Sequence, residues 1–239
     1  ADETGIPIIL QAGPSCRAHT PIPILGKMFR YLASQTKTNI CCHVDHGYTL
    51  DECYEGIDSG FTSVMFDGSK LTLKENIKIS KKIASRAHKY NISIEGEIGF
   101  VGYDNGKISE GTNIEDAVTF ANKSNIDAMA ISVGNTHLQT SKKASIDFNK
   151  INLIEAKTKI PLVLHGSSGI PVEQRKKLAR KTKVAKLNIG TEIRMTFGEA
   201  LRKNLKNNPK TYDRLQLLKP TIKDLTKVTK KIIKQIGPN

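Results

Sequence analysis

The histidines of this 239-residue chain gather where short apolar runs end, because four of the six stand in the segments 42–47, 134–137 and 165–169. Carboxylates follow two further apolar runs, at Asp67 and in the segment 95–97. One histidine in such a place is more often a hydrogen-bonded polar group than a ligand. Histidines at three separate run ends, with carboxylates nearby, are hard to explain as packing. Three imidazoles that leave a fourth position open are typical of a catalytic zinc site.

The spacing within the segment 42–47 distinguishes a candidate metal ligand from a candidate proton-transfer residue. Side chains alternate along a strand, so His43 and Asp45 share one face while His46 lies on the other. His46 stands at the strand exit, where the backbone can turn it toward the site, and we assign it as a ligand. His43 lies deeper and is predicted to be a hydrogen-bonded structural side chain. Asp45 is then available for proton transfer rather than ligation.

Two glycine-containing loops are suited to phosphate. The first, at 165–169, joins the candidate ligand His165 to a Gly-Ser-Ser-Gly turn that opens a helix near Pro171. The second, at 188–191, follows the next apolar run. Exposed backbone N–H groups at such turns bind anions, and the loops after the last two strands of a barrel frequently hold a phosphate. Together with the histidines, these loops predict a metal-plus-phosphate site.

Short apolar runs alternate with longer amphipathic stretches, which predicts parallel strands joined by helices. The predicted strands are 6–12, 39–46, 63–67, 92–99, 128–134, 161–166 and 185–190. The predicted helices are 24–36, 50–59, 73–90, 114–124, 148–157 and 172–181, with Thr49 and Asn113 as N-caps and a terminal helix at 215–236 that has Pro220 near its start.

Seven such units without a composition break predict an α/β protein, a (β/α)₈ TIM barrel whose first strand and helix are absent, in a single domain spanning 1–239. A doubly wound open sheet is the alternative. In a barrel the carboxyl ends of the strands meet at one mouth, so the polar residues that follow them converge. The longest unpatterned stretches, 100–112 and 136–146, also follow strand ends, where barrel enzymes keep active-site loops.

The amino-acid composition limits the classes of partner that we expect. The net charge of +14 and pI of about 9.6 raise the question of nucleic acid, but aromatic residues are only 5% and Trp is absent, so base-stacking platforms are scarce. We expect no nucleic-acid partner and an anionic small substrate instead. No apolar run approaches 18 residues and no signal peptide is visible, so we expect no membrane partner. Four cysteines without a C-x-x-C pair predict reduced thiols and a cytoplasmic location.

These segments resemble the class II, zinc-dependent ketose-bisphosphate aldolases, which include fructose-1,6- and tagatose-1,6-bisphosphate aldolases. The matching stretches are HVDHG at 43–47, GFTSVMFDGS at 60–69, IEGEIG at 94–99, ISVGNTH at 131–137, LVLHGSSGIP at 162–171 and KLNIGTEIR at 186–194. The resemblance runs in order over nearly the whole chain. It implies a TIM barrel, reversible aldol cleavage of a phosphorylated ketose as in glycolysis, and a homodimer or homotetramer.

The resemblance also implies roles for individual residues around the reacting carbons. His46, His137 and His165 match the zinc ligands, Asp45 matches the acid/base, and Asn188 matches a residue near the reacting carbons.

Further matches concern phosphate and a second metal position. Gly166 and Ser168 match part of a phosphate and monovalent-cation (Na⁺ or K⁺) site, and Thr191 a phosphate contact in the loop that contains Gly190. Arg194 matches the arginine that holds the distal phosphate, often across a subunit interface. Glu95 and Glu97 lie where the family keeps carboxylates near the metal, as candidates for a second metal position.

Three departures from the family pattern affect these expectations. The family's first strand and helix would precede Ala1. Leu138 follows His137 where the family usually has glycine. Gly190 replaces an aspartate that contacts substrate hydroxyls in fructose-bisphosphate aldolases, and the tagatose-type enzymes, which also lack it, are nearer. We therefore predict a weak preference for fructose 1,6-bisphosphate.

Two rival functions remain open at this point. One is another barrel metal-dependent hydrolase or isomerase that acts on a sugar phosphate with the same three histidines. The other is a non-enzyme, a basic nucleic-acid-binding or scaffold protein with a relict site.

Overall fold

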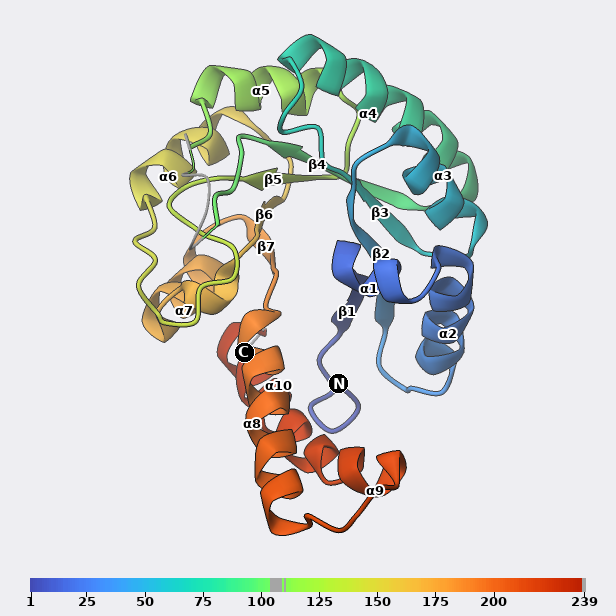
Figure 1. The fold of residues 1–239 in the computed structure, drawn as a ribbon. Coiled ribbons are helices and arrows are strands. Elements are labelled where there is room, and N and C mark those ends of the chain that lie inside the picture. Colours follow the sequence, from blue (N-terminus) through green and yellow to red (C-terminus); the bar gives the residue numbers. More distant parts are fainter. Residues whose placement is uncertain (104–108, 110, 238–239) are drawn as a thin grey trace.

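The structure, a computed structural model, describes residues 1–103, 109 and 111–237. Seven parallel strands form one strongly curved sheet, and their order in the sheet follows their order in the chain (Figure 1). The strands are β1 (Ile8–Ala12), β2 (Ile40–Gly47), β3 (Ser63–Phe66), β4 (Ser93–Ile98), β5 (Ala128–Ile131), β6 (Leu162–Leu164) and β7 (Val184–Leu187). Each predicted strand is confirmed, with no end moved by more than three residues.

Six helices connect successive strands and cover the convex face of the sheet (Figure 1). They are α2 (Ile22–Ser34), α3 (Leu50–Asp58), α4 (Leu73–Ala87), α5 (Ile114–Lys123), α6 (Phe148–Lys157) and α7 (Val172–Lys181). The predicted caps are confirmed, since the Thr49 side chain accepts from the N–H of Glu52 and Asn113 from those of Glu115 and Asp116. Shorter turns are α1 (Pro14–His19), η1 (His88–Tyr90) and η2 (Ser167–Gly169).

The main core lies between this helical layer and the sheet. Phe61, Ile83, Phe120 and Ile151 are among its fully buried side chains. All four residues of β3 are buried, which is the continuous apolar pattern of a parallel strand covered on both faces. Because every strand pair is parallel, the carboxyl ends of all seven strands lie at one edge.

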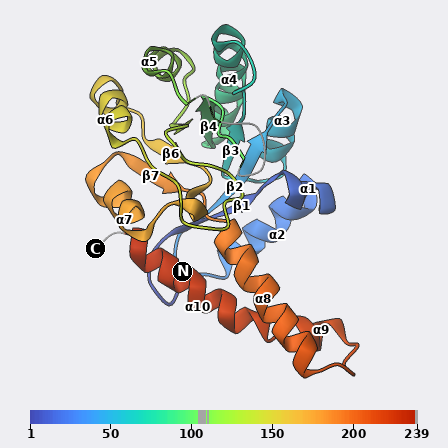
Figure 2. The ribbon, with the colours of Figure 1, turned by 60° about the vertical axis from the view of Figure 1, so that its left-hand side comes forward.

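The C-terminal part differs from the prediction in two ways. The single helix expected at 215–236 is two helices, α9 (Arg214–Leu218) and α10 (Thr221–Ile236), because Pro220 between them has no N–H to continue the first. A long helix, α8 (Thr191–Asn207), was not predicted; it packs against α10 and extends with α9 away from the sheet (Figure 2).

The strand order, β1 to β7 in sequence, excludes the doubly wound alternative, in which the order of the strands reverses at a switch point within the sheet. In the described residues β1 pairs only with β2 and β7 only with β6, so the sheet is a partial barrel. Closure by an eighth strand stays a prediction. Part of the expected loop at 100–112, residues 104–108 and 110, lies outside the described residues. No helix in the described part of the chain has the length and apolar character needed to cross a bilayer.

Candidate metal centre and active site

A bulge at the end of β2 turns His46 toward the concave side of the sheet. Val44 pairs with Val64 and Gly47 with Phe66, so three steps along β2 face two along β3. His46 takes up the extra residue with a φ of 54°, a left-handed conformation uncommon for a residue other than glycine. The inward turn that the sequence suggested at the strand exit is therefore built by a bulge.

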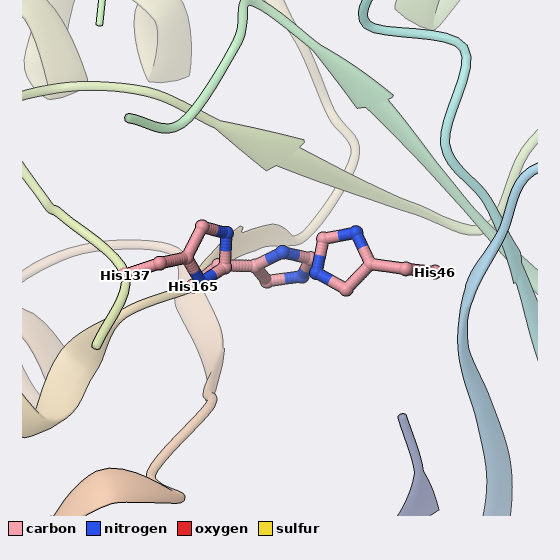
Figure 3. Close-up of side chains that lie close together, drawn as sticks. All are labelled: His46, His137 and His165. Carbon is pink, nitrogen blue, oxygen red and sulfur yellow. The ribbon is translucent and has the colours of Figure 1, made fainter. Parts of the chain in front are cut away.

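The imidazoles of His46, His137 and His165 come together from three different strand ends (Figure 3). The ring centroids lie 4.5 Å apart for His46 and His165, 5.3 Å for His46 and His137, and 5.8 Å for His137 and His165. One ring nitrogen from each lies within 4.8 Å of the others, a spacing at which a single metal ion fits. His165 is fully buried and His137 is half-buried.

Carboxylates fix the orientation of two of these rings. Asp67 Oδ2 lies 2.8 Å from His46 Nδ1, and Glu95 Oε1 lies 2.9 Å from His165 Nε2. A ring nitrogen that donates to a carboxylate leaves the other nitrogen with a free lone pair, which is how metal-binding histidines are usually held. His165 Nδ1 and Glu97 Oε2 are buried and have no hydrogen-bond partner among the described residues. These orphaned atoms fit a metal ion.

Glu95 and Glu97, the two candidates for a second metal position, have different surroundings. Glu97 Oε2 lies 3.3 Å from His165 Nδ1 and 3.7 Å from His46 Nδ1, and Glu97 forms a second ligand cluster with His46 and Asp67. Glu95 instead bonds the far nitrogen of His165. Of the two, Glu97 is the one placed for a second metal position, while Glu95 supports a ligand from behind.

The pKa shifts agree with a centre built for a cation. Burial lowers the pKa of His137 to about 3, so its ring is neutral and open to a metal. Burial opposes ionisation of Asp67, but hydrogen bonds from His46 and Ser69 outweigh it and lower its pKa to about 2. Burial lowers the pKa of His165, but the hydrogen-bonded Glu95 and the neighbouring Glu97 carboxylate raise it, with a net rise to about 10.

Asp45 lies beside these ligands and is held by Asn188. The Asn188 amide donates to Asp45 Oδ1 over 3.1 Å, joining the end of β2 to the residue after β7. Burial opposes ionisation of Asp45, but His46, His165 and Lys186 together lower its pKa. The structure thus brings an ionised carboxylate next to the histidine cluster, where the sequence expected a proton-transfer group.

The two predicted phosphate loops are neighbours. The N–H of Ser167 donates to the carbonyl oxygen of Asn188, and the N–H of Glu192 donates to Ser168 Oγ. Gly166 has a φ of 62°, and a Cβ there would lie 2.2 Å from the carbonyl oxygen of Thr136, so only glycine fits.

The second loop ends at the N-terminus of α8. Gly190 is its N-cap residue and Thr191 its first residue. Arg194 Nη2 donates to Thr191 Oγ1 over 3.1 Å, and a Cβ on Gly190 would lie 2.8 Å from Arg194 Nη1. The guanidinium therefore folds back over the loop, in space that Gly190 leaves open.

Leu138, which stands where the family usually has glycine, has a backbone conformation that is unusual for leucine. Leu138 has a φ of 59° and an exposed side chain, so leucine carries a left-handed conformation that glycine adopts at no steric cost.

Several residues around the site were not assigned from the sequence. Arg17, on the short helix α1, donates to the carbonyl oxygens of Ala12, Asp45 and His46 and so fixes the end of β2. Lys186 reaches the site from β7, two residues before Asn188 and therefore on the same strand face, a spacing that could have revealed it. His43 bonds Ser63 Oγ over 2.8 Å, as predicted for a structural histidine.

Comparison with known proteins decides the family. A family profile described as "Fructose-bisphosphate aldolase class-II" matches residues 1–239. The chain belongs to this family. It is a lyase, and class II aldolases act on phosphorylated sugars and are in general zinc-dependent.

Relatives of this class II aldolase carry different substrate names. It is 36% identical over 201 residues to a 6-phospho-5-dehydro-2-deoxy-D-gluconate aldolase of Shouchella clausii, which covers 83% of this chain and 68% of the relative. It is 33% identical over 202 residues to a fructose-bisphosphate aldolase of Staphylococcus aureus, covering 83% and 70%.

Solved structures show the same fold. The YdjI aldolase of Escherichia coli K12 superposes with a TM-score of 0.83 at 26% identity, over 99% of this chain and 84% of that one. A Campylobacter jejuni fructose-bisphosphate aldolase gives a TM-score of 0.83 over the same shares at 19% identity, which supports the fold alone. The partial barrel is consistent with the TIM-barrel-like fold of these enzymes.

Proposed function

We propose that this class II aldolase, a single domain over residues 1–239, catalyses reversible retro-aldol cleavage of a phosphorylated ketose, giving dihydroxyacetone phosphate and an aldehyde, with zinc as its metal. The observation that carries the proposal is the meeting of three imidazoles from three strand ends with one ionised carboxylate beside them, on the concave side of the sheet. That combination supplies the two groups the reaction needs, a Lewis acid and a base.

His46, His137 and His165 are the residues that would hold zinc, with Asp67 and Glu97 beside His46 as a second position. Zinc bound there acts as a Lewis acid that stabilises negative charge developing next to a carbonyl, an effect of several kcal/mol. A monovalent cation beside Gly166 and Ser168 stays a prediction from the family resemblance.

Asp45 is the proposed proton-transfer residue. It accepts the proton of the C4 hydroxyl, C4 becomes the carbonyl carbon of the aldehyde, and the electron pair of the C3–C4 bond passes toward the C2 carbonyl. The resulting enediolate then takes up one proton at C3 to give dihydroxyacetone phosphate, which balances the proton removed from the C4 hydroxyl. In the reverse direction Asp45 returns the proton to the new hydroxyl. Asn188 orients the carboxylate by its hydrogen bond to Oδ1, so its contribution is to hold the base next to the reacting carbons.

We assign phosphate binding to the loops after β6 and β7. Gly166 and Ser168 belong to one loop, and Gly190 and Thr191 to the other, which opens the 17-residue helix α8. A helix N-terminus favours an anion through its free N–H groups and its dipole. Arg194, in the first turn of α8, adds the cationic side chain.

The proposed substrate is a phosphorylated ketose, and we expect no strong preference for fructose 1,6-bisphosphate. At position 190 there is no carboxylate to accept hydrogen bonds from substrate hydroxyls, and the Arg194 guanidinium lies against that glycine instead. A tagatose-type bisphosphate is one candidate. The substrate in the name of the Shouchella clausii relative is another, since its chemistry also allows cleavage to dihydroxyacetone phosphate.

A homodimer or homotetramer is the proposed assembly, and the surface of α8 supports it. This helix has no buried residue although it carries several apolar side chains. Met195, Phe197 and Leu205 are 39%, 37% and 44% exposed. A second copy packed on α8 would cover them. The cytoplasmic location predicted from the sequence stays a prediction.

The test is a substrate panel on zinc-loaded protein. Fructose 1,6-bisphosphate, tagatose 1,6-bisphosphate and 6-phospho-5-dehydro-2-deoxy-D-gluconate are incubated separately, and dihydroxyacetone phosphate is trapped by a coupled dehydrogenase that oxidises NADH. We expect triose phosphate from at least one of them, and none after removal of the metal. Release of inorganic phosphate without triose phosphate would favour the hydrolase alternative and overturn the proposal.

A further inference from the structure

A lysine lies inside the curved sheet, next to the candidate metal centre. Lys186 Nζ is 2.6 Å from Glu95 Oε2 and 3.1 Å from His43 Nε2. Its side chain is only 10% exposed, and those of Glu95 and His43 are 3% and 2% exposed. Burying a charged pair is costly, and its attraction offsets that cost only where further hydrogen bonds satisfy the remaining atoms. The position of this ion pair therefore calls for an explanation.

The ion pair continues into a candidate metal ligand. Glu95 uses its other oxygen, Oε1, to accept from His165 Nε2 over 2.9 Å. Lys186, Glu95 and His165 thus form one hydrogen-bonded row across three strand ends. At the end of that row His165 Nδ1 is buried and has no hydrogen-bond partner in the described chain.

Lys186 is the cation on the Oε2 side of Glu95. His43 Nε2 is 3.7 Å from Glu95 Oε2, but burial and the Lys186 ammonium lower the pKa of His43 to about 3, so that ring is neutral. His43 is also fixed from its other side by Ser63. Without Lys186, Glu95 would be a buried carboxylate with no full counter-charge on the Oε2 side, and its Oε1 would no longer be held against His165.

We propose that Lys186 is a positioning residue for the metal centre. By holding Glu95 it keeps Glu95 Oε1 on the N–H of His165 Nε2 and leaves Nδ1, the nitrogen without a hydrogen-bond partner in the described chain, facing the metal position. The inference rests on the proposed metal centre and deepens it, because it extends the determinants of zinc binding to a residue that does not contact the ion. A carboxylate behind a histidine ligand typically changes metal affinity by about 10–100-fold.

The experiment is a double-mutant cycle on zinc affinity. Lys186→Met, Glu95→Gln and the double variant are prepared from the full chain, and the zinc dissociation constant is measured by competition with a chromophoric chelator. Circular dichroism checks the fold. We expect each single variant to bind zinc about 10–100-fold more weakly. We expect the double variant to bind as Glu95→Gln does, because Lys186 acts only through Glu95.

Two further variants separate positioning from a general effect of charge or folding. Lys186→Arg keeps the cation and is expected to restore affinity to within about tenfold of wild type, that is, at the weak end of such outer effects. Lys181→Met removes an exposed lysine from the end of α7 and is expected to change nothing. An equal loss in Lys181→Met would show that overall charge, not Lys186, is being measured.

Unchanged zinc affinity in a folded Lys186→Met protein would overturn the proposal. It would also be overturned if the loss of zinc-binding free energy in the double variant equalled the sum of the losses in the two single variants. If Lys186→Met does not fold because Glu95 is left unpaired, the double variant and Glu95→Gln are compared directly. Equal affinities are then the expected result, and a further tenfold loss contradicts it. Absence of zinc binding in the wild type would instead refute the metal centre itself, which distinguishes the two failures.

Discussion

Replacing Asp45 by Asn removes the proposed base while keeping the shape of the side chain. The amide oxygen of asparagine can still accept the hydrogen bond that Asn188 donates over 3.1 Å, so the side chain is expected to stay in place. What is lost is the ability to take a proton, which the wild-type carboxylate has because nearby His46, His165 and Lys186 outweigh burial and lower its pKa. Positioned proton transfer contributes about 10²–10⁴-fold, so kcat should fall by that factor, equivalent to roughly 3–5 kcal/mol of barrier.

The assay compares kcat on the best substrate of the panel with the zinc content of the same preparation. Asp45→Asn should keep its zinc, because Asp45 belongs to neither of the two ligand clusters of the described chain. Asp67→Asn is the contrasting variant. Asp67 holds His46 Nδ1 over 2.8 Å, so this change should weaken zinc binding by about 10–100-fold. Activity within threefold of wild type in Asp45→Asn would remove Asp45 from the mechanism, and loss of zinc with activity would make it a metal-site residue.

Three further predictions concern the metal and the substrate. His137→Ala should lose most of its bound zinc with the fold intact, because one of three ligands is gone; unchanged metal stoichiometry would refute the ligand assignment. Zinc affinity should rise with pH between 6 and 9, because the pKa of His165 is raised to about 10 and the metal must displace that proton throughout this range; a chelator competition that gives the same constant at both ends contradicts it. Fructose and tagatose 1,6-bisphosphate should be cleaved with similar kcat/KM, because no side chain at Gly190 supplies the charged hydrogen bond, worth roughly 1.5–3 kcal/mol; a hundredfold preference for the fructose compound would exclude this reading.

The sequence predicted the layout of the sheet because parallel strands buried on both faces are continuous apolar runs. β3, with all four residues buried, is the clearest case. The gathering of His137 and His165 followed from the same rule, since both stand after such runs. Helix α8 was not predicted; it has no residue buried in the core of the described chain, so no apolar run at core spacing marked it.

Finer features of the site depend on geometry that the sequence does not encode locally. Strict alternation would place His46 on the opposite face from Asp45, and a bulge with positive φ brings it back. Glu95 and Glu97 share a strand face, so alternation cannot separate them. Only the contacts of His165 assign Glu97 to the metal side and Glu95 to the far nitrogen.

The role of the three histidines in metal-dependent cleavage can be tested by titrating zinc into metal-free protein during cleavage of the best ketose phosphate. We expect no triose phosphate without metal and a rise in rate that levels off at one zinc ion per chain. In His137→Ala the same titration should stay near the baseline. Full activity in the metal-free wild type, or an undiminished response in His137→Ala, would contradict an aldolase whose metal is held by His46, His137 and His165.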